Sequence, residues 1–211
     1  MAVPDPFAGA WRRSPWLPVA LVIALAITLS ACSFDLGSLS STPDRGEPPR
    51  AAPVASGVAE AQALTARGEM LARSGNVKEA LAEFDRALDI DPNNAQALYG
   101  RGLLYQGEKQ HQSAIHDFTA ANGLRPQLAD PLLGRAISYL ALDKFKEAAL
   151  DLDEAVQSEP QNGQLWSTRG LAYERLGDKS KAAESYGRAV SLRPKDEAAR
   201  NGFARVGGKP G

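Results

Sequence analysis

The tetrapeptide "DPNN" at residues 91–94 decides the fold, because its proline recurs at a fixed interval. The prolines stand 34 residues apart, in "DPNN", "RPQL", "EPQN" and "RPKD", at Pro92, Pro126, Pro160 and Pro194. A proline lacks the amide hydrogen that a helix needs, and it disfavours helical geometry in the residue before it. Each of these prolines is therefore expected to follow the end of a helix.

The 34-residue period divides the chain into four units, which are residues 61–94, 95–128, 129–162 and 163–196. When the units are aligned, small residues fall into register at position eight (Gly68, Gly102, Ala136, Gly170), position twenty (Ala80, Ala114, Ala148, Ala182) and position twenty-seven (Ala87, Ala121, Ala155, Ala189). Large apolar residues fall into register at position four (Leu64, Leu98, Leu132, Trp166), position eleven (Leu71, Tyr105, Tyr139, Tyr173) and position twenty-four (Phe84, Phe118, Leu152, Tyr186). This complementarity indicates two closely packed helices in each unit.

Within each unit, apolar residues recur at helical spacing on both sides of a short break, which reads "RSGN", "GEKQ", "ALDK" or "RLGD". One such hairpin cannot bury its apolar face alone, whereas a stack of hairpins can, provided that its ends are capped. The sequence therefore predicts an all-α solenoid. Residues 197–206, "EAARNGFARV", are expected to form a capping helix, with Phe203 facing the last unit and Arg200 and Arg205 in water.

A 34-residue period of this kind resembles the tetratricopeptide repeat, and the resemblance covers residues 61–196 without an insertion. It implies a right-handed α-solenoid of four helix hairpins, with a capping helix and tail at residues 197–211. It also implies a concave groove lined by positions five, nine and twelve of the first helices.

The middle of this expected groove is mostly apolar and its ends are polar. The predicted partner-binding residues are Tyr99, Leu103, Gln106, Leu133, Ile137, Leu140 and Leu171. Such a trough suits an amphipathic helix or an extended apolar segment of a partner. The alternative is that some of these leucines fill gaps between adjacent units.

Some members of this family clamp a C-terminal carboxylate with Lys, Asn and Arg side chains. The nearest matching places in this chain hold other residues, namely Thr65, Glu69, Gly100, Asp130 and Gly134. A chaperone tail is therefore not expected as the ligand.

Position seven, commonly leucine in this family, is arginine in all four units: Arg67, Arg101, Arg135 and Arg169. Position twenty-three, on the second helix, holds Glu83, Asp117, Asp151 and Ser185. One interpretation is an arginine array for an acidic partner. The other, which we favour, is a series of internal ion pairs whose stems pack against the neighbouring helix.

The sequence offers no candidate for catalysis, for a metal or for a cofactor. His111 and His116 are five residues apart, which separates them by about 140° on a helix, so they do not share a face as metal ligands would. No HExxH, phosphate-binding glycine loop or G-x-S-x-G motif is present. A net charge of −1 without a basic patch argues against nucleic acid as a partner. We therefore expect a non-enzyme.

The single cysteine, Cys32, lies in "LSACS" directly after a short apolar run from Leu17 to Leu29 and a basic pair, Arg12 and Arg13. This layout is typical of an export signal, and Leu29-Ser30-Ala31-Cys32 resembles a bacterial lipobox, in which the cysteine receives lipid. The predicted organisation is a signal peptide at residues 1–31, then a lipidated cysteine and disordered linker at residues 32–60. An uncleaved transmembrane anchor and ordinary secretion are the alternatives.

These features together predict a lipid-anchored adaptor of a bacterial cell envelope that binds envelope proteins or peptide segments. Similar lipoproteins serve pilus and secretion assembly or the control of peptidoglycan hydrolases. Ser33 after the cysteine favours, by analogy, the outer membrane facing the periplasm. The alternatives are a regulatory subunit of an envelope enzyme or an enzyme itself.

Overall fold

The computed structural model describes residues 53–208, and all the regular structure in that range is helical. Its nine α-helices are α2 (Pro53–Arg73), α3 (Val77–Ile90), α4 (Ala95–Gly107), α5 (His111–Leu124), α6 (Ala129–Ala141), α7 (Phe145–Ser158), α8 (Gly163–Leu176), α9 (Lys179–Leu192) and α10 (Glu197–Arg205). None of these helices is long and apolar enough to span a membrane. The predicted signal peptide and Cys32 lie outside the described residues.

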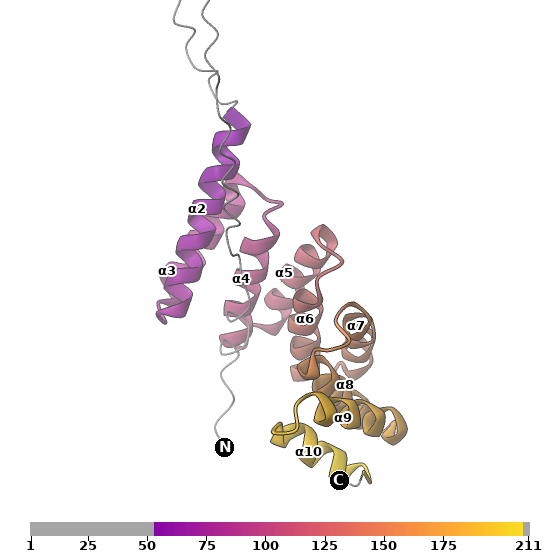
Figure 1. Ribbon diagram of the computed structural model, residues 1–211. Helices are drawn as coiled ribbons and strands as arrows, with labels where there is room; N and C mark the ends of the chain where they lie inside the picture. Colours follow the sequence, from indigo (N-terminus) through magenta and orange to yellow (C-terminus); the bar gives the residue numbers. More distant parts are fainter. Residues whose placement is uncertain (1–52, 209–211) are drawn as a thin grey trace, which may run out of the picture. The chain divides into compact units, whose positions relative to one another are not determined.

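The helices pair as four hairpins, and each hairpin packs against the next along the chain (Figure 1). The pairs are α2 with α3, α4 with α5, α6 with α7 and α8 with α9, and α10 packs on the last pair. The predicted all-α solenoid of four hairpins with a capping helix is therefore confirmed.

Every hairpin turns at position fifteen, through a residue with left-handed backbone. Two of these residues are glycines, Gly75 (φ 81°) and Gly177 (φ 82°). The other two are Lys109 (φ 61°) and Asp143 (φ 57°), which adopt the same conformation despite the steric cost of a side chain there. The four breaks in the apolar pattern are thus one turn type, which gives each hairpin the same geometry.

The core is built on the ring at position twenty-four, which lies between two first helices. A Cβ atom added to Gly102, in the same unit as Phe118, would lie 2.8 Å from the ring, and one added to Gly134, in the next unit, would lie 2.6 Å from it. Phe84 lies in the same way between Gly68 and Gly100, and Tyr186 lies between Gly170 and Gly202. The missing Cβ atoms leave the room that these rings occupy.

The third unit follows the same rule with different residues. Its position twenty-four is Leu152, a smaller side chain that is fully buried. Glycines lie on both sides of the Phe84, Phe118 and Tyr186 rings. The residues at the two corresponding positions around Leu152 are Ala136 and Thr168. The size of the inserted side chain and the size of the residues around it therefore change together, which keeps the core filled.

The start of α2 corrects one prediction. The segment at residues 32–60 was expected to be a disordered linker, but the helix begins at Pro53. Proline is tolerated at the first helical position because its missing amide hydrogen would have no partner there. Residues 53–60 thus form the first turns of the helix that leads into the first unit.

The capping helix carries an ion pair that the sequence did not predict. Phe203 is half-buried and lies beside Gly187 of α9, as expected for a residue that faces the last unit. Arg200 is exposed, also as expected. Arg205 is exposed as well, with 56% of its side chain in solvent, and its guanidinium also donates to both carboxylate oxygens of Glu174 at 2.7 and 2.9 Å. This pair ties α10 to α8.

Candidate functional site

We call positions five, nine and twelve of α4, α6 and α8 the first-helix face, since the sequence predicted that these positions bind a partner. Three of the predicted residues are buried, Leu103, Gln106 and Leu133, with 7%, 8% and 9% of their surface exposed. The remaining four, Tyr99, Ile137, Leu140 and Leu171, are half-buried. The first three residues therefore fill space within the stack, which is the alternative that the sequence left open.

Gln106 links the second unit to the third. Its side-chain amide donates to the carbonyl oxygen of Gly134 at 2.7 Å and to the hydroxyl of Ser138 at 2.8 Å. Ser138 is fully buried. A buried amide that is satisfied by the neighbouring unit is a structural element, because its loss would leave polar groups unpaired.

Three of the four half-buried residues are aliphatic, and the fourth, Tyr99, adds a hydroxyl group. Ile137, Leu140 and Leu171 pack against the core of the third and fourth units and keep part of their surface in solvent. The Tyr99 ring is tilted against the Phe118 ring, with 5.8 Å between centroids. Burial, and then the charge of Asp130, raise the pKa of Tyr99. Its hydroxyl therefore stays protonated at neutral pH.

The polar residues at the first-unit end of this face are already engaged in hydrogen bonds. Gln96 donates to Glu69 at 2.8 Å. The Asn94 amide donates to the Thr65 hydroxyl at 3.0 Å, and the Asn94 carbonyl oxygen caps α4 by accepting from the amide of Ala97. The bond from Gln96 joins the second unit to the first, and Asn94 holds the start of α4 beside α2.

The other end of the face is closed by Glu174. Besides Arg205, this carboxylate accepts a hydrogen bond from the Tyr186 hydroxyl at 2.6 Å. The bond from Arg205 is the largest cause of a lowered pKa at Glu174, and the Tyr186 hydroxyl also lowers it. Glu174 is therefore an ionised anchor for the capping helix.

The position-seven arginines form the internal pairs that the sequence predicted. Arg101 binds both carboxylate oxygens of Asp117 at 2.7 and 2.9 Å, and Arg135 binds Asp151 at 2.8 Å through two bonds. Arg169 donates to the Ser185 hydroxyl at 2.6 Å, and Arg67 lies 3.7 Å from Glu83. Arg101, Arg135 and Arg169 are therefore engaged within the stack, and the hypothesis of an arginine array for an acidic partner is not needed for them.

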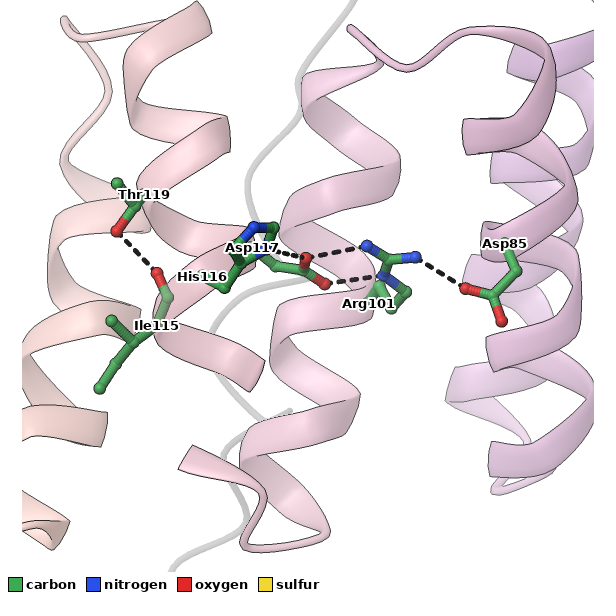
Figure 2. Close-up of polar contacts among 6 residues, drawn as sticks. All are labelled: Asp85, Arg101, Ile115, His116, Asp117 and Thr119. Carbon is green, nitrogen blue, oxygen red and sulfur yellow. Dashed lines mark hydrogen bonds and ion pairs between the residues drawn. The ribbon is translucent and has the colours of Figure 1, made fainter. Parts of the chain in front are cut away.

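Each of the last three arginines has a second partner that sequence reasoning missed. Figure 2 shows Arg101 between Asp117 of its own unit and Asp85 of the preceding unit, which it meets at 2.7 Å. Arg135 reaches Thr119 at 3.1 Å in the same way, and Arg169 reaches Asp153 at 2.7 Å. The sequence did contain a pattern that could have revealed these partners. Each second partner is at position twenty-five of the preceding unit, 16 residues before its arginine.

We call the contacts of Arg101, Arg135 and Arg169 with their two partners each the arginine ladder. Its arginines are mostly shielded from water, since the side chains of Arg101, Arg135 and Arg169 are 20%, 15% and 12% exposed. The hydrogen bonds from Arg101 to Asp117 raise the pKa of Arg101, and Asp151 raises that of Arg135. Arg101 and Arg135 therefore remain charged at all ordinary pH values, and the ladder joins consecutive hairpins.

Neither histidine lies on the first-helix face, since both belong to α5. His116 is exposed, with Nδ1 3.4 Å from Asp117, and His111 Nδ1 is buried without a hydrogen-bond partner in the described part of the chain. Within residues 53–208 no three His, Cys, Asp or Glu side chains are placed to hold a metal ion.

Three protein-family models match the sequence. A model described as "TPR repeat" matches residues 68–109, and models described as "Tetratricopeptide repeat" match residues 95–128 and 133–197. Together these matches run through most of the four units. No curated protein sequence matches the chain.

Solved structures of other proteins share the fold. MamA superimposes with a TM-score of 0.66 at 20% identity, over 70% of this chain and 80% of MamA. TTC0263, a thermophilic TPR protein of Thermus thermophilus, has a TM-score of 0.57 at 24% identity, over 69% and 80% of the two chains. The first TPR of Spaghetti (RPAP3), bound to the HSP90 peptide SRMEEVD, has a TM-score of 0.53 at 27% identity, over 55% and 92%.

Proposed function

The chain belongs to the tetratricopeptide repeat family, and from this premise we propose that it is a non-catalytic adaptor that holds a partner protein at a bacterial envelope membrane. The fold supports protein–protein interaction in general. The partner contributes an apolar or amphipathic segment, which lies across the half-buried residues of the first-helix face. Pilus or secretion assembly and the control of peptidoglycan hydrolases are processes in which such an adaptor serves.

One observation carries the choice of ligand. The side chains that remain partly exposed on the first-helix face are Tyr99, Ile137, Leu140 and Leu171, which are apolar except for one protonated hydroxyl. A bound apolar segment would remove their remaining surface from water, at about 25 cal/mol per Å². Leu103 and Leu133 beside them are buried, so they are already ordered before a partner binds.

Ile137→Glu should weaken capture of the partner by about tenfold or more, because a carboxylate on this face loses its hydration without gaining a partner. Glu147→Lys, a change at an exposed position of α7, should leave capture unaltered. The measurement pairs recovery of partners from detergent-solubilised envelopes with circular-dichroism melting of both variants. Leu140→Glu near the end of α6 provides a second variant, and the melting curves of both are needed because Ile137 and Leu140 both pack against the core. Normal capture by folded Ile137→Glu and Leu140→Glu would reject the first-helix face as the binding surface.

A C-terminal carboxylate is not the proposed ligand. The Spaghetti domain is bound to a peptide that ends in EEVD, whereas the matching places here hold Thr65, Glu69, Gly100, Asp130 and Gly134. Glu69 repels an acidic peptide, and neither glycine offers a side-chain donor. The peptide SRMEEVD therefore serves as a negative control in the capture experiment.

The membrane attachment is proposed from the sequence around Cys32. The run of small residues before the cysteine, placed directly after an apolar segment, supports cleavage and lipidation at Cys32. A mature lipoprotein with several acyl chains stays membrane-bound, since more than one lipid signal is needed for stable anchoring. The proposed location is the outer membrane facing the periplasm, with residues 33–52 connecting the lipid to α2.

Cys32→Ala should abolish incorporation of radiolabelled palmitate and leave an uncut precursor, because the thiol is the only attachment point in the chain. The measurement is palmitate labelling together with the mass of the protein from washed membranes. Cys32→Ser is the control for side-chain size. Equal labelling of the wild-type and mutant proteins would contradict the lipid anchor.

A further inference from the structure

The first-unit end of the stack presents positions that every later unit buries. Position ten of the later units is 1%, 0% and 0% exposed, at Leu104, Ser138 and Ala172. In the first unit the same position is Met70, which is 60% exposed. Position three is buried in the later units, for example at Ala97 and Leu165, whereas Ala63 is exposed. In α4, α6 and α8 this side of the helix packs against the preceding unit. In α2 the same side is not covered by any other part of residues 53–208.

The arginine ladder is incomplete at the same place. Arg67 has a side chain that is 63% exposed, and its ion pair in the described part of the chain is the 3.7 Å contact with Glu83. Each later arginine also holds a polar side chain 16 residues earlier. For Arg67 that position is Ala51, preceded by Arg50, so the sequence supplies neither an acid nor a large apolar residue there.

We propose that this side of α2, formed by Ala63, Ala66, Arg67 and Met70, docks an amphipathic helix of another protein, one that carries an aliphatic residue followed by Asp or Glu. We call it the α2 docking surface. It is distinct from the first-helix face and does not depend on the function proposed for that face.

The chemistry of the docked helix follows from the later units. The residues that reach forward to the next unit are neighbours in sequence, as in Phe84-Asp85, where the ring meets Gly100 and the carboxylate meets Arg101. Position six of the first unit is Ala66 and not glycine. A Cβ atom at Gly100 would lie 2.6 Å from the Phe84 ring, so Ala66 excludes a phenyl ring placed in the same way.

The third unit shows which side chain fits instead. It offers Leu152-Asp153, and the following unit has Thr168 at position six, so an aliphatic residue is used where position six carries a Cβ atom. Asp153 binds Arg169 at 2.7 Å. An aliphatic residue followed by an acid therefore covers Ala66 and gives Arg67 its missing carboxylate. The charge selects the partner, and covering Met70 adds apolar burial.

The test uses a helix-stapled peptide with the sequence of residues 145–158, FKEAALDLDEAVQS, which contains Leu152-Asp153. The staple is needed because an unconstrained helix of this length is marginal in water. Binding to the full-length chain in detergent is measured by fluorescence anisotropy. Arg67→Glu and Met70→Glu should each weaken binding about tenfold or more. The Asp153→Lys peptide should bind poorly to the wild-type chain and regain affinity for Arg67→Glu. Glu147→Lys, at an exposed position of α7, is the control and should not change binding.

The outcomes that overturn the proposal are distinct. Failure of the peptide to bind both the wild-type chain and a chain that lacks residues 1–52, or equal binding to the wild-type chain, Arg67→Glu and Met70→Glu, would show that α2 has no such surface. A dimer in sedimentation that Met70→Glu abolishes would make a second copy the occupant. Binding that appears only after removal of residues 1–52 would make the chain's own N-terminal segment the occupant. Because Arg67 and Met70 are exposed, both variants are expected to melt normally.

Discussion

Phe118→Ala is expected to lower the free energy of unfolding by about 3–5 kcal/mol, because a fully buried ring would be replaced by a cavity. The ring lies between Gly102 and Gly134, which belong to two different units, so the loss should also separate those units. The measurement is urea denaturation followed by circular dichroism, with the melting midpoint as a second readout. A loss below about 1 kcal/mol would mean that the glycine positions do not hold the ring as described.

The contact between Gly134 and the Phe118 ring also predicts that the effects of substitutions at these two residues on stability are not additive. Gly134→Ala should cost about 1–3 kcal/mol by overpacking, since its new Cβ would lie 2.6 Å from the ring. With Phe118→Leu the cost should shrink, because the third unit already combines Leu152 with residues larger than glycine. Gly123→Ala on α5 is the matched control, since nothing lies within 4 Å of the added Cβ, and it should stabilise by up to about 1 kcal/mol. Strict additivity of the pair would contradict this account of the core.

Asp117→Ala is expected to cost about 2–4 kcal/mol, because Asp117 is 1% exposed and its removal leaves Arg101 without its bidentate partner. The remaining contact of Arg101, with Asp85, keeps the cost from being larger. Asp85→Ala is the control and should cost less than about 1 kcal/mol, since the Asp85 side chain is 53% exposed. The measurement is again denaturation by urea.

Replacing both members of the pair tests its role. Arg101→Leu together with Asp117→Leu should be close to neutral in stability, because no unpaired charge remains and leucine packs against the same helices. Capture of partners should be unchanged, since the ladder serves packing between helices. Loss of capture with an unchanged melting curve would mean instead that Arg101 meets an acidic partner.

The sequence by itself determined the hairpins. The prolines 34 residues apart, the breaks in the apolar pattern and the alternation of small and large residues all concern helices that are close in the chain. The first partner of each arginine was predictable for the same reason. Arg101 and Asp117 lie on the two helices of one hairpin, and helical periodicity with a short turn places them face to face.

The predicted site was only partly accessible from the sequence. Positions five, nine and twelve were assigned from the resemblance, and the residues there differ in exposure although their positions are equivalent. Leu103 is buried, whereas Ile137 and Leu171 are half-buried at the same position nine. The difference depends on the side chains that the neighbouring units bring to each place, which no single unit encodes.

What only the tertiary structure decided are the contacts between units and with the capping helix: Asp85 with Arg101, Gln106 with Ser138 and Glu174 with Arg205. Each joins residues that lie 16 to 32 positions apart and outside a common hairpin. The angle and the offset at which one hairpin packs on the next come from close packing of all the side chains at that interface. The period of a sequence defines which residues recur, but it does not contain that angle.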